Sequence, residues 1–167
     1  MSVRAATRDD IVQIVNCNLS AKTQKELKGF APPIGISKYH DSRLLKGAWR
    51  YPNIVEGEEI YVCLHTDKIV GYAIVIFDQD YLELDNMDIC GKFQGKGFGK
   101  ELVELIENFA RSRGKSRITL GTTRSSDGTP WKSYPFWIKM GYRVSGEIRT
   151  SAGIRYGFTE IRFEKSI

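Results

Sequence analysis

A glycine-rich run at residues 94–100, Gln-Gly-Lys-Gly-Phe-Gly-Lys, is the part of the sequence that most directly indicates chemistry. Glycines let backbone N–H groups approach an anion closely, and a helix beginning at such a run adds the positive end of its dipole. Lys92, Lys96 and Lys100 bring further positive charge to the same place. The run therefore predicts a cradle for a ligand that contains phosphate.

Two common phosphate-binding motifs do not fit this run. A Walker A loop needs Ser or Thr after its Gly-Lys pair, whereas Lys100 is followed by Glu101. A Rossmann fingerprint reads GxGxxG after the first strand of a parallel sheet, whereas Gly95, Gly97 and Gly99 read GxGxG. A plain glycine turn that binds nothing remains the alternative.

Three β-rich segments precede the run, and an amphipathic helix follows it. The segments Ile60–His65, Ile69–Phe77 and Tyr81–Ile89 are joined by short polar turns, which predicts an antiparallel meander. The helix ends near Gly114, and Ser116–Thr122 reads as a further strand, so the sheet is expected to be mixed. The apolar residues on one face of this helix are Phe98, Leu102, Leu105, Ile106 and Phe109.

Elements are also expected on both sides of this centre. Val3–Ala6 reads as a short strand, and Thr7 with Asp10 reads as the capped start of a helix. Residues 27–57 are rich in Gly and Pro, and only Asp41–Lys46 there favours a helix. The C-terminal part predicts a helix around Lys132–Met140, and a strand pair then follows. That pair comprises Tyr142–Arg149 and Arg155–Lys165, with a turn at Thr150–Gly153. The predicted class is α+β, with a mixed, mostly antiparallel central sheet of about seven strands flanked by about four helices.

Length and composition limit the alternatives. The chain has 167 residues, of which 41% are hydrophobic and 27% charged, so we expect residues 1–167 to form a single domain. No apolar run approaches the length of a membrane span and the N-terminus does not resemble a signal peptide, so a cytoplasmic protein is expected. Cys17, Cys63 and Cys90 form no CxxC pair and are expected to be buried free thiols, and no metal site is expected.

The net charge of +5 is concentrated near the C-terminus. From residue 132 onward there are seven basic residues and three acidic ones, which leaves +4 in that segment. A basic surface suits anionic ligands in general, but a solvated surface explains the charge equally well. The basic residues are Lys132, Lys139, Arg143, Arg149, Arg155, Arg162 and Lys165.

The Gln-x-x-Gly-x-Gly pattern of Gln94, Gly97 and Gly99 resembles the pyrophosphate loop of the GCN5-related N-acetyltransferases, the GNAT superfamily. The later segment 136–142, Phe-Trp-Ile-Lys-Met-Gly-Tyr, resembles a second element of that family. The resemblance implies acetyl-CoA as acetyl donor. It also implies that the backbone of one strand pairs with the pantetheine arm, and that the loop holds the pyrophosphate. The cofactor-binding residues implied are Met87, Asp88, Ile89, Gln94, Gly95, Lys96, Gly97, Phe98, Gly99 and Lys100.

The same resemblance points to candidate catalytic residues. Glu83 stands eleven residues before Gln94, at the position of the general base in some family members, and Asp85 shares its face of the strand. The proton donor to the thiolate is often a tyrosine, but Trp137 occupies that position here. We therefore assign Tyr134 as the candidate donor, with water as the alternative.

The resulting hypothesis is transfer of an acetyl group from acetyl-CoA to a primary amine of a small molecule or of a protein. A non-catalytic acyl-CoA-binding or sensor module on the same fold is the alternative, because the usual tyrosine is missing. A nucleic-acid-binding domain is the least favoured reading, and no membrane partner is expected. The family commonly forms homodimers, and only the resemblance suggests one here. The identity of the amine cannot be read from the sequence.

Overall fold

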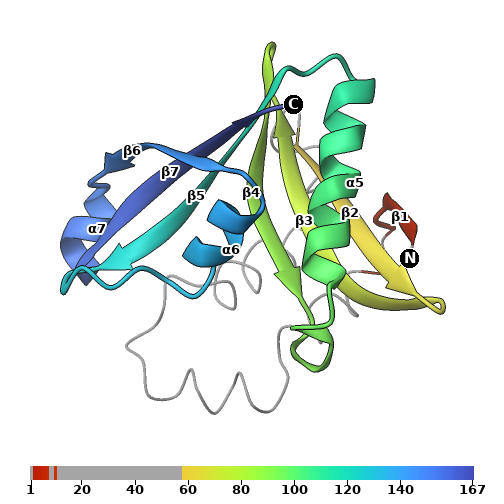
Figure 1. The fold of residues 1–167 in the computed structure, drawn as a ribbon, viewed down its shortest axis with the longest axis horizontal. Coiled ribbons are helices and arrows are strands. Elements are labelled where there is room, and N and C mark those ends of the chain that lie inside the picture. Colours follow the sequence, from red (N-terminus) through yellow and green to blue (C-terminus); the bar gives the residue numbers. More distant parts are fainter. Residues whose placement is uncertain (1, 8–9, 11–57) are drawn as a thin grey trace. The chain divides into compact units, whose positions relative to one another are not determined.

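Seven strands form one mixed sheet in the order β1-β2-β3-β4-β5-β7-β6 (Figure 1). The computed structural model describes residues 2–7, 10 and 58–167, so the expected helix over residues 41–46 lies outside the described part. The strands are β1 Ser2–Ala5, β2 Glu58–His65, β3 Lys68–Phe77, β4 Tyr81–Ile89, β5 Arg117–Ser125, β6 Arg143–Ile148 and β7 Phe158–Ser166. The described α-helices are α5 Phe98–Ser112, α6 Tyr134–Lys139 and α7 Ser151–Tyr156. The predicted α+β class with a mixed sheet is confirmed.

The chain divides into two compact units, and the first comprises Met1–Ile76 and Asn86–Ile106. Its strands β1, β2 and β3 pair antiparallel in chain order, and the β2–β3 hairpin among them is the one that the sequence predicts. Thr66 and Asp67 link β2 to β3 with φ angles of 48° and 61°, the left-handed conformation of a tight hairpin turn. The buried side chains that pack together in this unit are Ile60, Val62, Ile69, Tyr72 and Ile74.

A buried carboxylate fixes the chain after β1. The Asp10 carboxylate accepts hydrogen bonds from the Thr7 amide at 2.6 Å and the Thr7 hydroxyl at 2.8 Å. Arg4 donates to both carboxylate oxygens of Asp10, at 2.6 and 2.9 Å. The bond from the Thr7 amide is one half of the capping box predicted for Thr7 and Asp10, whereas the helix expected after them lies outside the described residues. Together the contacts lower the pKa of Asp10 to about 2.

The second unit comprises Phe77–Asp85 and Glu107–Ile167. Here β4 runs parallel to β5 from Tyr81–Arg117 to Leu84–Leu120, and β5 pairs antiparallel with β7 along its whole length. Alternate residues of these strands are buried, as expected for a sheet with one face against a core. The buried set is Leu82, Leu84, Ile118, Leu120, Ile161 and Phe163.

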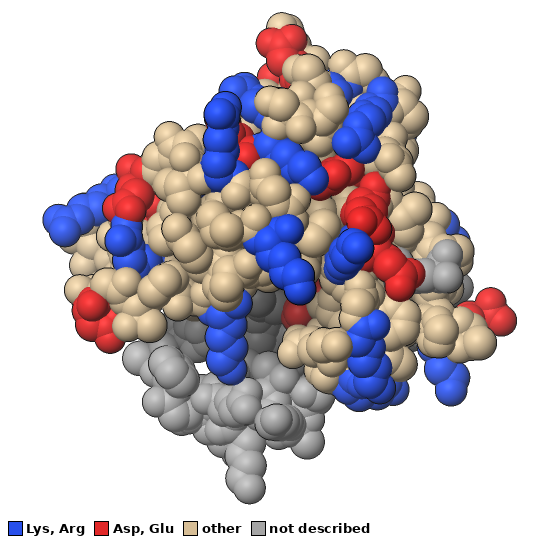
Figure 2. Space-filling view, viewed as in Figure 1, with Lys and Arg blue, Asp and Glu red and all other residues tan. Residues whose placement is uncertain are grey.

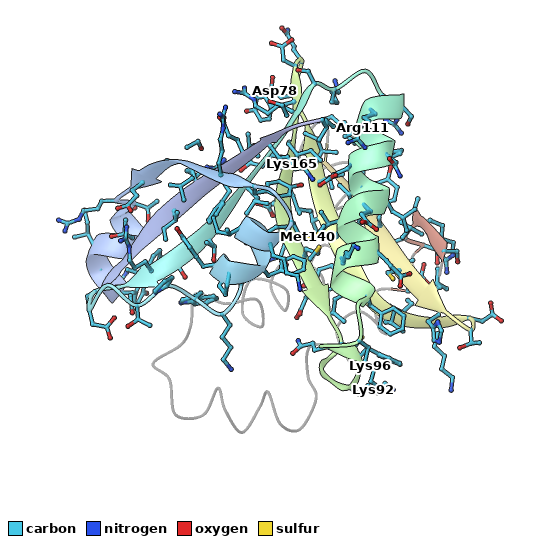
Figure 3. All side chains as sticks on the ribbon, viewed as in Figure 1. Asp78, Lys92, Lys96, Arg111, Met140 and Lys165 are labelled. Atoms are coloured by element: carbon cyan, nitrogen blue, oxygen red, sulfur yellow. The ribbon has the colours of Figure 1, made fainter. Side chains whose placement is uncertain are left out.

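An ammonium group on β7 holds α6 in place within the second unit. The Nζ atom of Lys165 donates to Glu107 Oε1 of α5 at 2.8 Å and to the carbonyl oxygen of Met140 at 2.9 Å. Arg111 Nη2 lies 3.8 Å from the other oxygen of the same carboxylate, Glu107 Oε2. Figure 3 labels Arg111, Met140 and Lys165. Because Met140 follows the last residue of α6, the bond satisfies a carbonyl at the helix end.

Two sequence predictions are wrong in the described part of the chain. The turn expected at Thr150–Gly153 is instead the start of α7, so the last strand begins at Phe158 and not at Arg155. The Thr150 hydroxyl accepts the Gly153 amide at 2.9 Å, and Gly157 ends α7 with a φ of 72°, which gives this short segment a cap at each end. Cys63 is a buried thiol as expected, whereas Cys90 is disulfide-bonded and not a free thiol.

The Asp10 contacts predict a stability change at acidic pH. The folded-state pKa of about 2 lies below the unfolded value of 3.8, so the stabilisation is present above pH 4 and lost as the pH falls toward 2. Asp10→Asn is expected to lower the free energy of unfolding by about 1–2 kcal/mol at pH 7, with the half-exposed Arg4 screened by solvent. Urea unfolding should show that the difference in free energy of unfolding between the wild type and Asp10→Asn becomes smaller from pH 7 to pH 3. The surface control Glu104→Gln should have the same free energy of unfolding as the wild type.

Candidate functional site

The glycine-rich run lies between β4 and α5. The amide of Cys90 donates to the Val70 carbonyl of β3 at 2.8 Å, so the chain stays paired to β3 as it leaves β4. A short 3-10 helix, η2 Gly91–Phe93, follows, and the side-chain amide of Gln94 then donates to the carbonyl of Ile89 at 2.8 Å. This last bond returns the start of the loop to the end of β4.

Backbone amides of the loop have no partner among the described residues. None of the amides of residues 95–100 donates a hydrogen bond to another part of the described chain, and the first helical bond is donated by Glu101 to the Gly97 carbonyl at 3.2 Å. Gly95 and Gly97 have φ angles of 75° and 92°, a backbone conformation that suits glycine. Adjacent amide donors at a helix N-terminus are a common kind of binding site for anions.

Side chains around the loop are basic and aromatic. The Nζ atoms of Lys92 and Lys96 lie 5.1 and 5.7 Å from the centre of the Phe93 ring, and both lysines extend at the end of the loop (Figure 3). Phe93 contacts Phe98 edge-on at 5.7 Å, and Phe98 contacts His65 at 5.0 Å. The rings therefore support the loop from β2 to the start of α5, and the lysines provide positive charge.

The end of β4 carries a carboxyl group in an apolar setting. Asp88 Oδ1 accepts the Ile89 amide at 2.7 Å. Burial raises the pKa of Asp88 to about 6, although the bonds from Ile89 and Gln94 act in the opposite direction. Gly71 of β3 lies directly beside this point, because a Cβ at Gly71 would be 2.7 Å from the Asp88 carbonyl oxygen. Met87 is half-buried and Ile89 is buried. The strand residues predicted to bind the cofactor, Met87–Ile89, therefore lie at the end of β4, just before the loop.

A polar pocket of about 200 Å³ lies in the second unit, on the face of β4, β5 and β7 opposite the buried one. Glu83 and Asp85 both line it, as their alternation along the strand predicts. Glu83 Oε1 accepts from Arg162 Nη2 at 2.9 Å, and Arg162 Nη1 donates to Glu160 Oε1 at 2.8 Å. The remaining lining residues are Gly121, Thr122 and Thr123.

Glu160 and Arg162 were not identified as site residues from the sequence. Their alternation on a strand predicts that the two side chains share a face of the sheet. The sequence near them does not show that this face contains Glu83, because Arg162 and Glu83 are 79 residues apart and the pairing of their strands must be known.

Tyr134, the candidate proton donor, is the first residue of α6. Its ring contacts the buried Phe163 of β7 at a centroid distance of 5.3 Å, and its hydroxyl makes no hydrogen bond within the described part of the chain. Ser133, directly before it, shares a 2.8 Å hydrogen bond with Thr122 of β5. Trp137 is only 6% exposed and packs against Phe136 and Tyr142, so it belongs to the core.

Basic side chains of the C-terminal segment are partly used in ion pairs. Arg143 pairs with Glu164 at 2.9 Å, and Arg162 and Lys165 have the carboxylate partners described above. Figure 2 shows lysine and arginine side chains interspersed with acidic ones on the face drawn, and no single basic patch. Among the described helices none has the length and apolar character needed to cross a membrane, and no group of metal-ligating side chains occurs in the same residues.

Comparison with known families identifies the chain. A model of the acetyltransferase (GNAT) family matches residues 25–142, which is more than half of the sequence. The chain belongs to the GNAT acetyltransferase family. The match includes the candidate base Glu83, the loop at residues 94–100 and the whole of α6. The resemblance inferred from Gln94, Gly97 and Gly99 is therefore confirmed.

Individual relatives agree with this assignment. The chain is 29% identical over 122 residues to the uncharacterized protein YxbD of Bacillus subtilis, covering 68% of this chain and 73% of the relative. It is 28% identical over 141 residues to an uncharacterized N-acetyltransferase of Bacillus licheniformis, covering 79% and 80%.

Solved structures share the fold. An aminoglycoside 6'-N-acetyltransferase complexed with coenzyme A matches with a TM-score of 0.71 at 17% identity, over 99% of this chain and 97% of that one. A PaiA N-acetyltransferase from Thermoplasma acidophilum, also in complex with coenzyme A, matches with a TM-score of 0.74 at 13% identity, over 99% and 98%. At these identities the likeness concerns the fold, so the GNAT chain's own substrate has to be argued from its residues.

Asp88 predicts a second pH effect on stability, with the opposite sign to that of Asp10. Its folded-state pKa of about 6 lies above the unfolded value of 3.8, so the carboxyl group destabilises the fold above pH 6 and costs nothing below about pH 4. Asp88→Asn, which keeps the acceptor for the Ile89 amide, is expected to stabilise the protein by about 1–3 kcal/mol at pH 7.5. Urea unfolding at pH 7.5 and 4.5 tests this prediction. An equal difference in free energy of unfolding between Asp88→Asn and the wild type at the two pH values would contradict it.

Proposed function

We propose that this chain transfers an acetyl group from acetyl-CoA to a primary amine, with residues 94–100 holding the diphosphate of the donor. The observation that carries the proposal is the set of amides at residues 95–100 without a partner in the described chain, at the first turn of α5. An anion bound there satisfies these donors and interacts favourably with the helix dipole. Family membership supports acetyl transfer as the reaction class.

The residues around the loop suit the rest of the donor. A Cβ at Gly95 or Gly97 would meet no atom within 4 Å, so the loop presents bare backbone to open space. Lys92, Lys96 and Lys100 are exposed beside it and offset the charge of phosphate groups. In this proposal the backbone of Met87, Asp88 and Ile89 pairs with the amides of the pantetheine arm, as an added strand would.

Acetyl-CoA supplies an activated acyl group as a thioester, and the chain provides proton transfers and orientation. In the proposed reaction Glu83 accepts a proton from the ammonium group of the acceptor, so that the amine nitrogen can attack the thioester carbon. The C–N bond forms, the C–S bond breaks, and the nitrogen loses its second proton to solvent. The Oε1 atom of Glu83 is bound to Arg162, whereas Oε2 has no partner in the described chain and is available for the first proton. Tyr134 donates a proton to the departing thiolate, using a hydroxyl that is not engaged elsewhere in the described residues.

The pocket around Glu83 favours an acceptor that approaches as a cation. Among the lining residues that the structure describes, three carry carboxylates (Glu83, Asp85 and Glu160) and one, Arg162, carries a guanidinium. An ammonium group is attracted by this balance before it loses its proton. Residues 1–167 act as one catalytic domain in this proposal, and the acceptor is a primary amine of a small molecule or of a protein.

Donor binding is tested by isothermal titration with acetyl-CoA, with CoA lacking the 3′-phosphate and with NAD. We expect acetyl-CoA to bind and NAD not to bind. Gly97→Ala is expected to weaken acetyl-CoA binding at least about tenfold, since a side chain at a φ of 92° is strained and the loop must shift. Gly128→Ala is the matched control, because Gly128 has a φ of 86° in a turn of the second unit, and it should bind like the wild type. Absence of acetyl-CoA binding to the wild type would reject the function.

The roles of Glu83 and Tyr134 predict changes in kcat. Release of the CoA thiol is measured with a panel of primary amines that includes spermidine, kanamycin and lysine methyl ester. Glu83→Gln is expected to lower kcat about 100-fold, and Tyr134→Phe about tenfold at saturating acetyl-CoA, with the KM for acetyl-CoA unchanged in both. Full activity of Glu83→Gln would exclude it as the base, and full activity of Tyr134→Phe would leave protonation of the thiolate to water. Acetyl-CoA binding with no turnover of any amine would favour the non-catalytic binding module.

A further inference from the structure

An arginine on β7 reaches across a neighbouring strand to the proposed base on β4. In the sheet of the second unit, Glu83 is opposite Thr119 of β5, and Arg162 is opposite Gly121 of the same strand. Two strand spacings of about 4.8 Å separate β7 from β4, so only a long side chain crosses this gap. The Arg162 guanidinium spans it and contacts Glu83 at 2.9 Å.

A glycine of β5 lies beneath the Glu160–Arg162 pair. A Cβ at Gly121 would lie 2.8 Å from Glu160 Oε1 and 3.4 Å from Arg162 Nη1, so a side chain there would displace this pair. Gly146 is the partner of Arg162 on the other side, in β6, and a Cβ at that position would meet nothing within 4 Å. Of the two glycines that are opposite Arg162 on the neighbouring strands, only Gly121 lies close to the Glu160–Arg162 ion pair.

The guanidinium is also held from its own strand. Glu160 and Arg162 alternate on β7 and therefore share a face, and they are joined at 2.8 Å. One arm of the guanidinium binds Glu160 and the other binds Glu83, with the side chains of Arg162 and Glu83 only 27% and 26% exposed. Anchoring at both ends restricts the rotamers of Arg162, and through the charge-assisted hydrogen bond those of Glu83.

We propose that Arg162 is a positioning residue for Glu83, which reaches it across Gly121 and fixes the carboxylate so that Oε2 faces the acceptor amine. This inference rests on the proposed function, in which Glu83 is the base. Placement of a catalytic group matters strongly for rate, because a displacement of about 1 Å can reduce turnover about 100-fold.

The first test needs no acceptor. In ¹⁵N NMR spectra of the full chain, the guanidinium N–H signals of Arg162, assigned with Arg162→Met, report whether its arms are held. Glu83→Gln and Gly121→Ala are expected to shift these signals, and the controls Glu164→Gln and Gly146→Ala are expected to leave them in place. Unchanged Arg162 signals in Glu83→Gln would overturn the proposal.

The second test measures turnover with an amine accepted by the wild type. Arg162→Met and Gly121→Ala are each expected to lower kcat about 10- to 100-fold with an unchanged KM for acetyl-CoA, and Arg162→Lys is expected to restore part of the loss. Arg143→Met, which removes an exposed ion pair on β6 and β7, and Gly146→Ala are the controls and should keep wild-type kcat.

A double-variant cycle distinguishes positioning from a separate effect on the fold. If Arg162 acts through Glu83, then Arg162→Met costs no further activity in the Glu83→Gln background. Equal losses in both backgrounds, or wild-type kcat in Arg162→Met, would overturn the positioning role. If instead Glu83→Gln alone keeps full activity, the base assignment in the proposed function fails. The unfolding midpoint of each variant, followed by circular dichroism, identifies any loss that comes from unfolding.

Discussion

The register of β4 is the constraint on which the candidate site depends. Its first residues pair in parallel with β5 and place Glu83 opposite Thr119, while its last residues lie beside β3, to which the amide of Cys90 is bonded. Because side chains alternate along a strand, a shift of one residue would exchange Glu83 with the buried Leu84. The apolar alternation within the second unit therefore also fixes the orientation of the proposed base.

The loop after β4 shows how backbone groups can be kept available for a ligand. Amide groups in helices and strands are satisfied by their own element, and buried ones without a partner are costly. At residues 95–100 the donors lie at a helix start, where no intrahelical acceptor exists, and they are largely exposed, so water satisfies them at little cost. Gln94, which bonds to the Ile89 carbonyl, ties the start of the loop to the end of β4.

The parts of the site that sequence predicts are those encoded locally. The spacing of Gln94, Gly97 and Gly99 is a property of six consecutive residues, and the alternation of Glu83 and Asp85 needs only a strand. The contact of Arg162 with Glu83 is not encoded locally, because it depends on the pairing of β7 with β5 and of β5 with β4. The wrong prediction at α7 has a different cause. Thr150 and Gly157 are local signals for the two ends of a helix, but the helix between them has only six residues, so the segment resembles a turn.

β5 contacts the supports of both proposed proton-transfer groups within the second unit. Gly121 of β5 lies under the Glu160–Arg162 pair that holds Glu83, and the next residue, Thr122, bonds to Ser133 beside Tyr134. Thr122 also lines the pocket that contains Glu83. Acetylation of an ammonium group removes two protons from the nitrogen and adds one to the departing thiolate, so a base and an acid must reach the same thioester. Two adjacent residues of β5 therefore connect the supports of both proposed groups.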